Sequence, residues 1–129
     1  IVEIAAAEGI KAIPLAVSGA FHSPLMQFAQ EGLAQAIENA EFKDLTTPLI
    51  ANVTAEPVCS GSEIKDLLVR QLVSPVRWND SMNKAISLCV TQGVEIGSGK
   101  VLMGLMRKIS RDVKVYPIET LEAFQSLKE

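Results

Sequence analysis

Short apolar runs alternate with longer segments of helical periodicity along this chain, and this alternation is the feature that most constrains its fold. The apolar runs are rich in Val, Ile, Leu and Ala, and glycine, proline or polar residues bound them. Strands that alternate with helices are typical of a layered α/β fold with a mainly parallel sheet. The sequence therefore predicts an α/β protein, with strands near residues 11–17, 47–53, 93–96 and 113–118 and helices near residues 24–40, 61–72, 81–89, 101–109 and 120–129.

Three of the expected helices follow residues whose side chains accept hydrogen bonds from a first helical turn. Serine, asparagine and aspartate suit this capping position, and proline suits the first helical position because its missing N–H needs no partner there. The expected starts are marked by Ser23 with Pro24, by Ser60 or Ser62, and by Asn79 or Asp80.

The chain opens on Ile1 in the stretch IVEIAAAEG, which is typical of the last turns of a helix that Gly9 ends. A natural protein rarely begins inside a helix. We therefore expect this chain to be the C-terminal part of something longer.

Composition narrows the range of partners and compartments. The formal net charge of −3 and the pI near 5.2 give no basic surface for nucleic acid. No apolar run approaches the ~18 residues of a membrane-spanning helix. Cys59 and Cys89 lie thirty residues apart with no second thiol or histidine nearby, so a zinc site is not expected. We expect a cytoplasmic chain in which both cysteines are small core residues.

The stretch GSGK, residues 97–100, superficially resembles a phosphate-binding loop. A P-loop would need glycine in place of Val94 and serine or threonine in place of Val101. A dinucleotide-binding loop would need glycine in place of Leu102. The pattern instead predicts a tight turn from a strand into a helix.

His22 is the only histidine of the chain, and it lies where an apolar run meets a helix start. Two interpretations compete: a structural loop residue, or a proton carrier held at a strand end. A general base of a serine hydrolase or acyltransferase would need a serine in a G-x-S-x-G turn. Ser98 has the wrong spacing, so the chain holds a candidate base and no nucleophile. The pattern alone favours the structural interpretation.

Three blocks add a more specific signal: VSGAFHSPLM at 17–26, VRQLVSPVRW at 69–78 and VEIGSGKVLMGLMRKI at 94–109. In this order and at these distances they resemble the C-terminal half of the malonyl-CoA:acyl carrier protein transacylase family of bacterial fatty-acid synthesis. The resemblance implies an α/β-hydrolase-like acyltransferase subdomain with a small ferredoxin-like subdomain inserted. Residues 1–17 would end the small subdomain, and residues 18–129 would form the C-terminal part of the large one.

The resemblance also implies a reaction and its residues. Malonyl would pass from malonyl-CoA to a serine of the missing N-terminal half, and then to the phosphopantetheine thiol of acyl carrier protein. His22 would be the general base, and the backbone carbonyl of Gln71 would orient it. Phe21 would select malonyl by filling the space that an α-methyl group needs. No cofactor or metal is implied.

Several expectations stay open at this point. The alternatives are a fragment of a polyketide synthase acyltransferase domain and a non-catalytic scaffold fragment. Phe21 could instead be an ordinary residue of the core, and Gln71 an ordinary polar residue at a helix end. Solvated surface or cap positions are expected for the arginines, which are Arg70, Arg77, Arg107 and Arg111.

Overall fold

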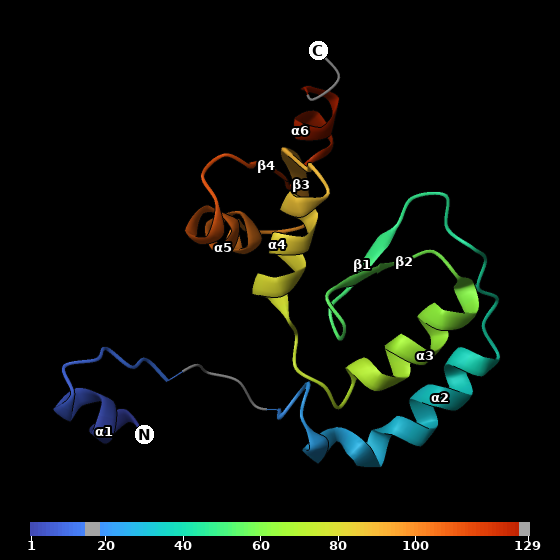
Figure 1. Cartoon of the computed structure of the whole chain (residues 1–129), viewed down its shortest axis with the longest axis horizontal. Helices are drawn as coiled ribbons and strands as arrows, with labels where there is room; N and C mark the ends of the chain where they lie inside the picture. Colours follow the sequence, from blue (N-terminus) through green and yellow to red (C-terminus); the bar gives the residue numbers. More distant parts are fainter. Residues whose placement is uncertain (15–18, 127–129) are drawn as a thin grey trace.

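The computed structural model describes residues 1–14 and 19–126, and these residues form a mixed α/β structure (Figure 1). The predicted α/β class is confirmed. In chain order the elements are α1 (Val2–Ala7), the 3₁₀ helix η1 (Pro24–Ala29), α2 (Gln30–Glu38), β1 (Leu49–Ala51), β2 (Glu56–Val58), α3 (Gly61–Gln71), α4 (Trp78–Ser87), β3 (Gln92–Ile96), α5 (Val101–Ile109), β4 (Lys114–Ile118) and α6 (Leu121–Gln125).

The first group of elements contains η1, α2, α3 and the hairpin β1–β2 (Figure 1). Its core is a cluster of Ala51, Val58, Ile64 and Leu67, which joins the hairpin to the inner face of α3. Ser60 caps α3, because its hydroxyl accepts from the backbone N–H of Glu63. This resolves the choice between the two candidate serines in favour of the first.

The second group contains α4, α5, α6 and the parallel pair β3–β4 (Figure 1). The register runs from Gln92 opposite Lys114 to Ile96 opposite Ile118, and α5 connects the two strands. Met106, Val113 and Ile118 are buried in this group. The strand–helix–strand unit predicted for residues 93–118 is therefore confirmed.

α4 links the two groups through the hairpin. The backbone N–H of Arg77 donates to the carbonyl of Asn52 at 2.9 Å, and the guanidinium Nη1 donates to the carbonyl of Thr54 at 2.8 Å. Lys84 forms an ion pair with Glu56 at 2.9 Å. These polar contacts hold α4 against the hairpin.

The expectation of a mainly parallel sheet is wrong for the described residues, because β1 and β2 pair antiparallel. The stretch between the strand expected at 47–53 and the helix expected at 61–72 contains β2, which the sequence analysis does not include among its strands. Ala55 adopts a left-handed φ of 60° and reverses the chain within a few residues. Glu56 and Pro57 are poor strand formers, so the sequence carried no local signal for this strand.

Some expectations at element ends are also wrong. α4 begins at Trp78 after Arg77, so neither Asn79 nor Asp80 is its cap; Asp80 instead binds the Arg77 guanidinium at 2.9 Å. Cys59 and Cys89 are exposed rather than in the core, since each follows the end of a strand or helix.

The N-terminal expectations are only partly covered. α1 ends before Gly9, whose φ of 70° is the left-handed conformation expected of a helix stop. Residues 11–14 are not in a strand, and the rest of the strand expected at 11–17 lies outside the described residues, as does the expected boundary between residues 17 and 18.

Candidate active site

His22 lies in a tight turn just before η1. Its backbone φ is 59°, in the left-handed region that residues other than glycine rarely occupy. The hydroxyl of Ser23 donates to the carbonyl of Ala20 at 2.7 Å and accepts from the N–H of Leu25 at 3.3 Å. Pro24 follows as the first residue of η1, as the sequence predicts.

The imidazole of His22 contacts the end of α3, 49 positions along the chain. Its Nδ1 lies 2.9 Å from the main-chain carbonyl oxygen of Gln71. A carbonyl oxygen can only accept, so Nδ1 must carry the hydrogen in this contact. In the neutral ring the other nitrogen, Nε2, then has a free lone pair, which is the state that a general base requires.

Gln71 is the last residue of α3, and its side chain closes the turn that follows. The amide Nε2 donates to the carbonyls of Ser74 at 2.9 Å and Pro75 at 3.3 Å. The N–H of Ser74 donates back to the Gln71 carbonyl at 3.2 Å. Nε2 also lies 3.4 Å from Nδ1 of His22, but both nitrogens carry hydrogen in this tautomer and they do not bond. The main-chain oxygen of Gln71 that faces His22 is thus held in place by the side-chain bonds of Gln71 and by the N–H of Ser74.

The packing of α2 on α3 fixes the distance between the turn that holds His22 and the end of α3 that holds Gln71. Gln30, at the start of α2, donates from Nε2 to the carbonyl of Val69 at 3.3 Å. At the opposite ends of the helices, Lys65 donates to the carbonyl of Glu38 at 3.1 Å. Because η1 contacts α2 directly, the helix that follows His22 is tied to the helix that ends at Gln71.

Phe21 precedes the histidine and is 62% exposed, so the described residues do not pack it in a core. Its ring lies over Gly19, where an added Cβ would come within 2.5 Å of a ring carbon. A side chain at position 19 would displace the ring. Gly19 was not among the predicted site residues, because only the folded turn shows that the ring lies over it.

The GSGK turn is closed by the carboxylate of Glu95, a residue for which the sequence predicted no role. Glu95, buried in β3, accepts at its two oxygens from the N–H groups of Leu102 at 2.9 Å and Met103 at 2.8 Å. These are the groups at the start of α5 that would otherwise bind an anion. The turn therefore serves the fold, as predicted, with Gly97 and Gly99 both at positive φ.

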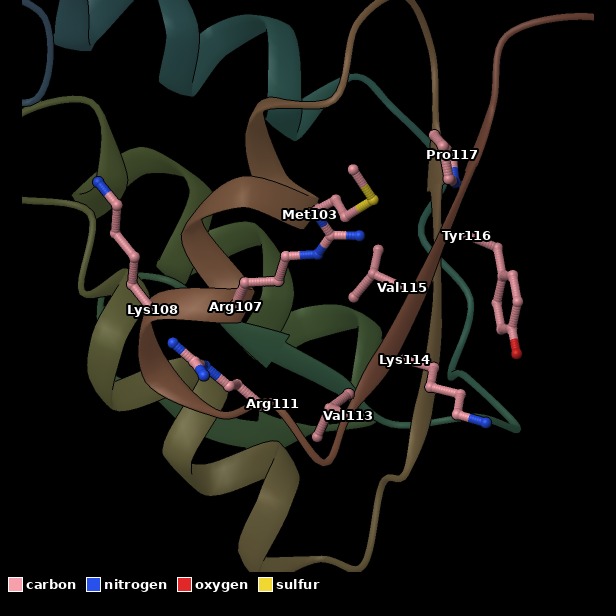
Figure 2. Close-up of a pocket in the computed structure, with 9 residues that line it drawn as sticks. All are labelled: Met103, Arg107, Lys108, Arg111, Val113, Lys114, Val115, Tyr116 and Pro117. Atoms are coloured by element: carbon pink, nitrogen blue, oxygen red, sulfur yellow. The ribbon is translucent and has the colours of Figure 1, made fainter.

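A groove of about 840 Å³ lies between α5 and β4, on the second group (Figure 2). Arg107 extends along it between Met103 and Val115 (Figure 2). His22 and Gln71 are not among the residues that line it, so the groove is separate from the histidine site. Its four cationic side chains are Arg107, Lys108, Arg111 and Lys114.

The arginines lie at surface or cap positions, and the described residues contain no candidate metal site. Arg70, Arg107 and Arg111 are exposed, and Arg77 is at the cap of α4, as expected. Residues 1–14 and 19–126 contain no cluster of three or more histidine, cysteine or acidic side chains able to hold a metal ion. Within the same residues no helix is both long and apolar enough to span a membrane.

No model of a known protein family matches the chain. Among curated proteins it is 46% identical over 132 residues to the malonyl CoA-acyl carrier protein transacylase of Bacillus subtilis (strain 168), which covers 98% of the chain and 42% of that relative. The transacylase of Staphylococcus aureus (strain MSSA476) is 42% identical over 119 residues, which covers 92% of the chain and 39% of the relative. The chain thus spans about 40% of the length of the curated relatives it matches.

The similar solved structures are also malonyltransferases, and the chain again matches about 40% of their length. The acyl-carrier-protein-S-malonyltransferase of Bartonella henselae superposes with a TM-score of 0.89 at 38% identity, covering 98% of the chain and 40% of that protein. A malonyl-transacylase solved in complex with a type II PKS acyl-carrier protein has a TM-score of 0.87 at 35% identity, covering 98% of the chain and 41% of that protein. The chain therefore shares the fold of the matching part of these proteins.

Proposed function

We propose that the chain is the histidine-bearing part of a malonyl-CoA:acyl carrier protein transacylase. The relatives with this name match nearly the whole chain, and one similar structure holds an acyl-carrier protein. The single observation that carries the proposal is the 2.9 Å contact from His22 Nδ1 to the Gln71 carbonyl, because it leaves Nε2 free as a base.

The reaction takes place in two halves, and in each half His22 carries one proton from the attacking group to the leaving group. In the first half, Nε2 takes the proton of a serine in the remaining part of the enzyme while its oxygen attacks the malonyl thioester. The imidazolium then protonates the departing sulfur of coenzyme A, and a malonyl-serine ester remains. In the second half, Nε2 takes the proton of the phosphopantetheine thiol, whose sulfur attacks the ester, and the proton returns to the serine oxygen.

The roles of the other residues follow from this cycle. The Gln71 carbonyl takes the place that an aspartate holds in a serine–histidine–aspartate triad, and it keeps the proton on Nδ1 through both halves. Phe21, beside the base, is placed to restrict the space next to the α-carbon of the acyl group. The proposal requires no metal or cofactor.

The proposed function also implies the subdomains of the chain, its partners and its compartment. Residues 1–17 end a small ferredoxin-like subdomain and residues 18–129 belong to the large acyltransferase subdomain. The names of the curated relatives favour a separate transacylase over a polyketide synthase domain or a non-catalytic scaffold. Malonyl-CoA, acyl carrier protein and the N-terminal half of the enzyme are the partners, and the cytoplasm is the compartment, where fatty-acid synthesis takes place in bacteria.

The test is the variant His22→Ala in the complete enzyme, with single-turnover formation of the malonyl-serine ester as the measurement. Loss of a general base lowers such rates by roughly 10²- to 10⁴-fold. Asn39→Ala is the control, since this exposed residue only caps the end of α2. Unchanged acylation in the His22 variant would return the histidine to a structural role.

A further inference from the structure

The hydroxyl of Ser23 makes hydrogen bonds on both sides of His22. Toward the N-terminus it donates to the carbonyl of Ala20 at 2.7 Å, and toward the C-terminus it accepts from the N–H of Leu25 at 3.3 Å. The first of these bonds spans the histidine, and it closes the turn that holds the imidazole.

The backbone of His22 needs such a closure because its φ of 59° is unfavourable for a residue with a Cβ. A left-handed conformation of this kind is strained and persists only where the surroundings hold it. If the turn relaxed to a negative φ, the Cα–Cβ bond would point elsewhere. The ring would then lose the Gln71 carbonyl, since the end of α3 is fixed independently by its own side-chain hydrogen bonds.

Helix capping alone does not account for this serine. Pro24 has no N–H, so the only bond that the Ser23 hydroxyl makes to the first turn of η1 is the long one from the N–H of Leu25; the 3.0 Å bond from Met26 goes to the main-chain carbonyl of Ser23, which any residue would provide. The short bond goes to the carbonyl of Ala20, on the N-terminal side of the histidine, and contributes nothing to the helix. The geometry of the hydroxyl therefore serves the turn more than the helix.

We propose that Ser23 is a positioning residue: its hydroxyl holds the backbone of His22 in the conformation that directs Nδ1 to the Gln71 carbonyl and Nε2 to the reacting groups. This inference rests on the proposed role of His22 as the base. Ser23 itself does not contact the substrate; it acts only through the imidazole.

The experiment measures malonyl transfer by the complete enzyme with two matched substitutions. Ser23→Thr keeps the hydroxyl and Ser23→Val replaces it with a methyl group of similar size. Both β-branched residues suit the extended backbone at this position, which has φ −138° and ψ 163°. We expect kcat to fall about 10- to 100-fold in the valine variant, as for a catalytic group misplaced by about 1 Å, with KM for malonyl-CoA unchanged. The threonine variant should retain most of the wild-type kcat.

Two further variants separate positioning from general stability. Thr120 caps α6 through a similar side-chain bond, 3.2 Å from the N–H of Ala123, so Thr120→Val tests the loss of a cap far from the histidine. It should leave kcat unchanged. In the double variant His22→Ala, Ser23→Val, the serine substitution should lower activity no further, because the group it positions is already absent.

The outcomes are distinct. A wild-type kcat for Ser23→Val, or a further loss in the His22→Ala background, overturns the positioning role of Ser23. Equal losses in the threonine and valine variants overturn it as well, because the hydroxyl would then not matter. Full activity of His22→Ala contradicts the proposed function itself, whatever the serine variants do.

Discussion

Phe21 and His22 are adjacent in the chain, but different parts of the molecule determine their positions. The imidazole is bonded to the end of α3, whereas the phenyl ring lies over Gly19 and is largely exposed. An exposed ring beside the proposed base contributes little to the core of the described residues. We propose that its effect on function is steric, and we expect that the ring can be replaced with little effect on the fold.

Replacing Phe21 with serine should narrow the preference for malonyl over methylmalonyl in the complete enzyme. The ring is proposed to occupy the space of an α-methyl group, and a contact of this size discriminates by about 10- to 200-fold at most. Competition between the two CoA thioesters measures the ratio of their kcat/KM values. Phe28→Ser, which removes another exposed ring seven residues farther on in η1, is the control. An unaltered ratio in the Phe21 variant would mean that the ring does not select the substrate.

Gln71 and Glu95 differ in how far the sequence could identify them. No periodicity relates His22 to a residue 49 positions away, so only the resemblance of whole blocks to a family suggested Gln71. Glu95 lies in the block at 94–109, but the resemblance implied no role for it. A single carboxylate in an apolar run indicates a solvent-facing residue, and only the folded turn shows that its oxygens are bonded to the start of α5.

Among the helices and strands, those with a clear apolar pattern were predictable and those fixed by long-range contacts were not. The apolar spacing of residues 61–72 and the runs at 93–96 and 113–118 correspond to α3, β3 and β4. β2 pairs with β1, and Arg77, just before α4, binds the hairpin as well as Asp80. No local apolar pattern predicts the contacts with the hairpin.

The start of α5 depends on a side chain from a neighbouring strand, so substituting Glu95 should destabilise the protein. Glu95→Ala removes two hydrogen bonds to a buried carboxylate, and each such bond to a charged group contributes about 1.5–3 kcal/mol. Glu95→Gln keeps one acceptor and should lose less. Urea unfolding of the complete enzyme measures the difference, with the exposed Glu119→Ala as the control. Equal midpoints for Glu95→Ala and the control would show that the capping bonds do not contribute.

For the molecule as a whole, the apolar strands lack cover in the described residues. Val94 and Ile96 project from β3 with 49% and 82% of their surface exposed, and neither two-stranded sheet has another strand beside it among these residues. The edges of short sheets with apolar faces readily associate with other chains. The solved relatives are about two and a half times as long as the part that matches, and the rest of such a protein could supply this cover.

We therefore expect the 129-residue chain on its own to self-associate and to form no malonyl-enzyme. Adding the upstream half of the enzyme as a separate fragment should raise the melting temperature and restore malonyl transfer, because it would supply both the cover and the serine. Light scattering and thermal unfolding, with and without that fragment, measure the two effects. A monomeric chain with a cooperative transition that the fragment does not alter would contradict this expectation.

The contact between the imidazole and a main-chain oxygen has a consequence for genetics. In a triad with an acidic member, one codon encodes the orienting group, and a single point mutation deletes it. Here every amino acid at position 71 provides the same oxygen, so no missense mutation there can remove the atom itself. Mutational scans will underestimate its importance, and searches for an acidic partner will miss the site. Selection can act only on the side chains that hold the last turn of α3 in place, that of Gln71 among them.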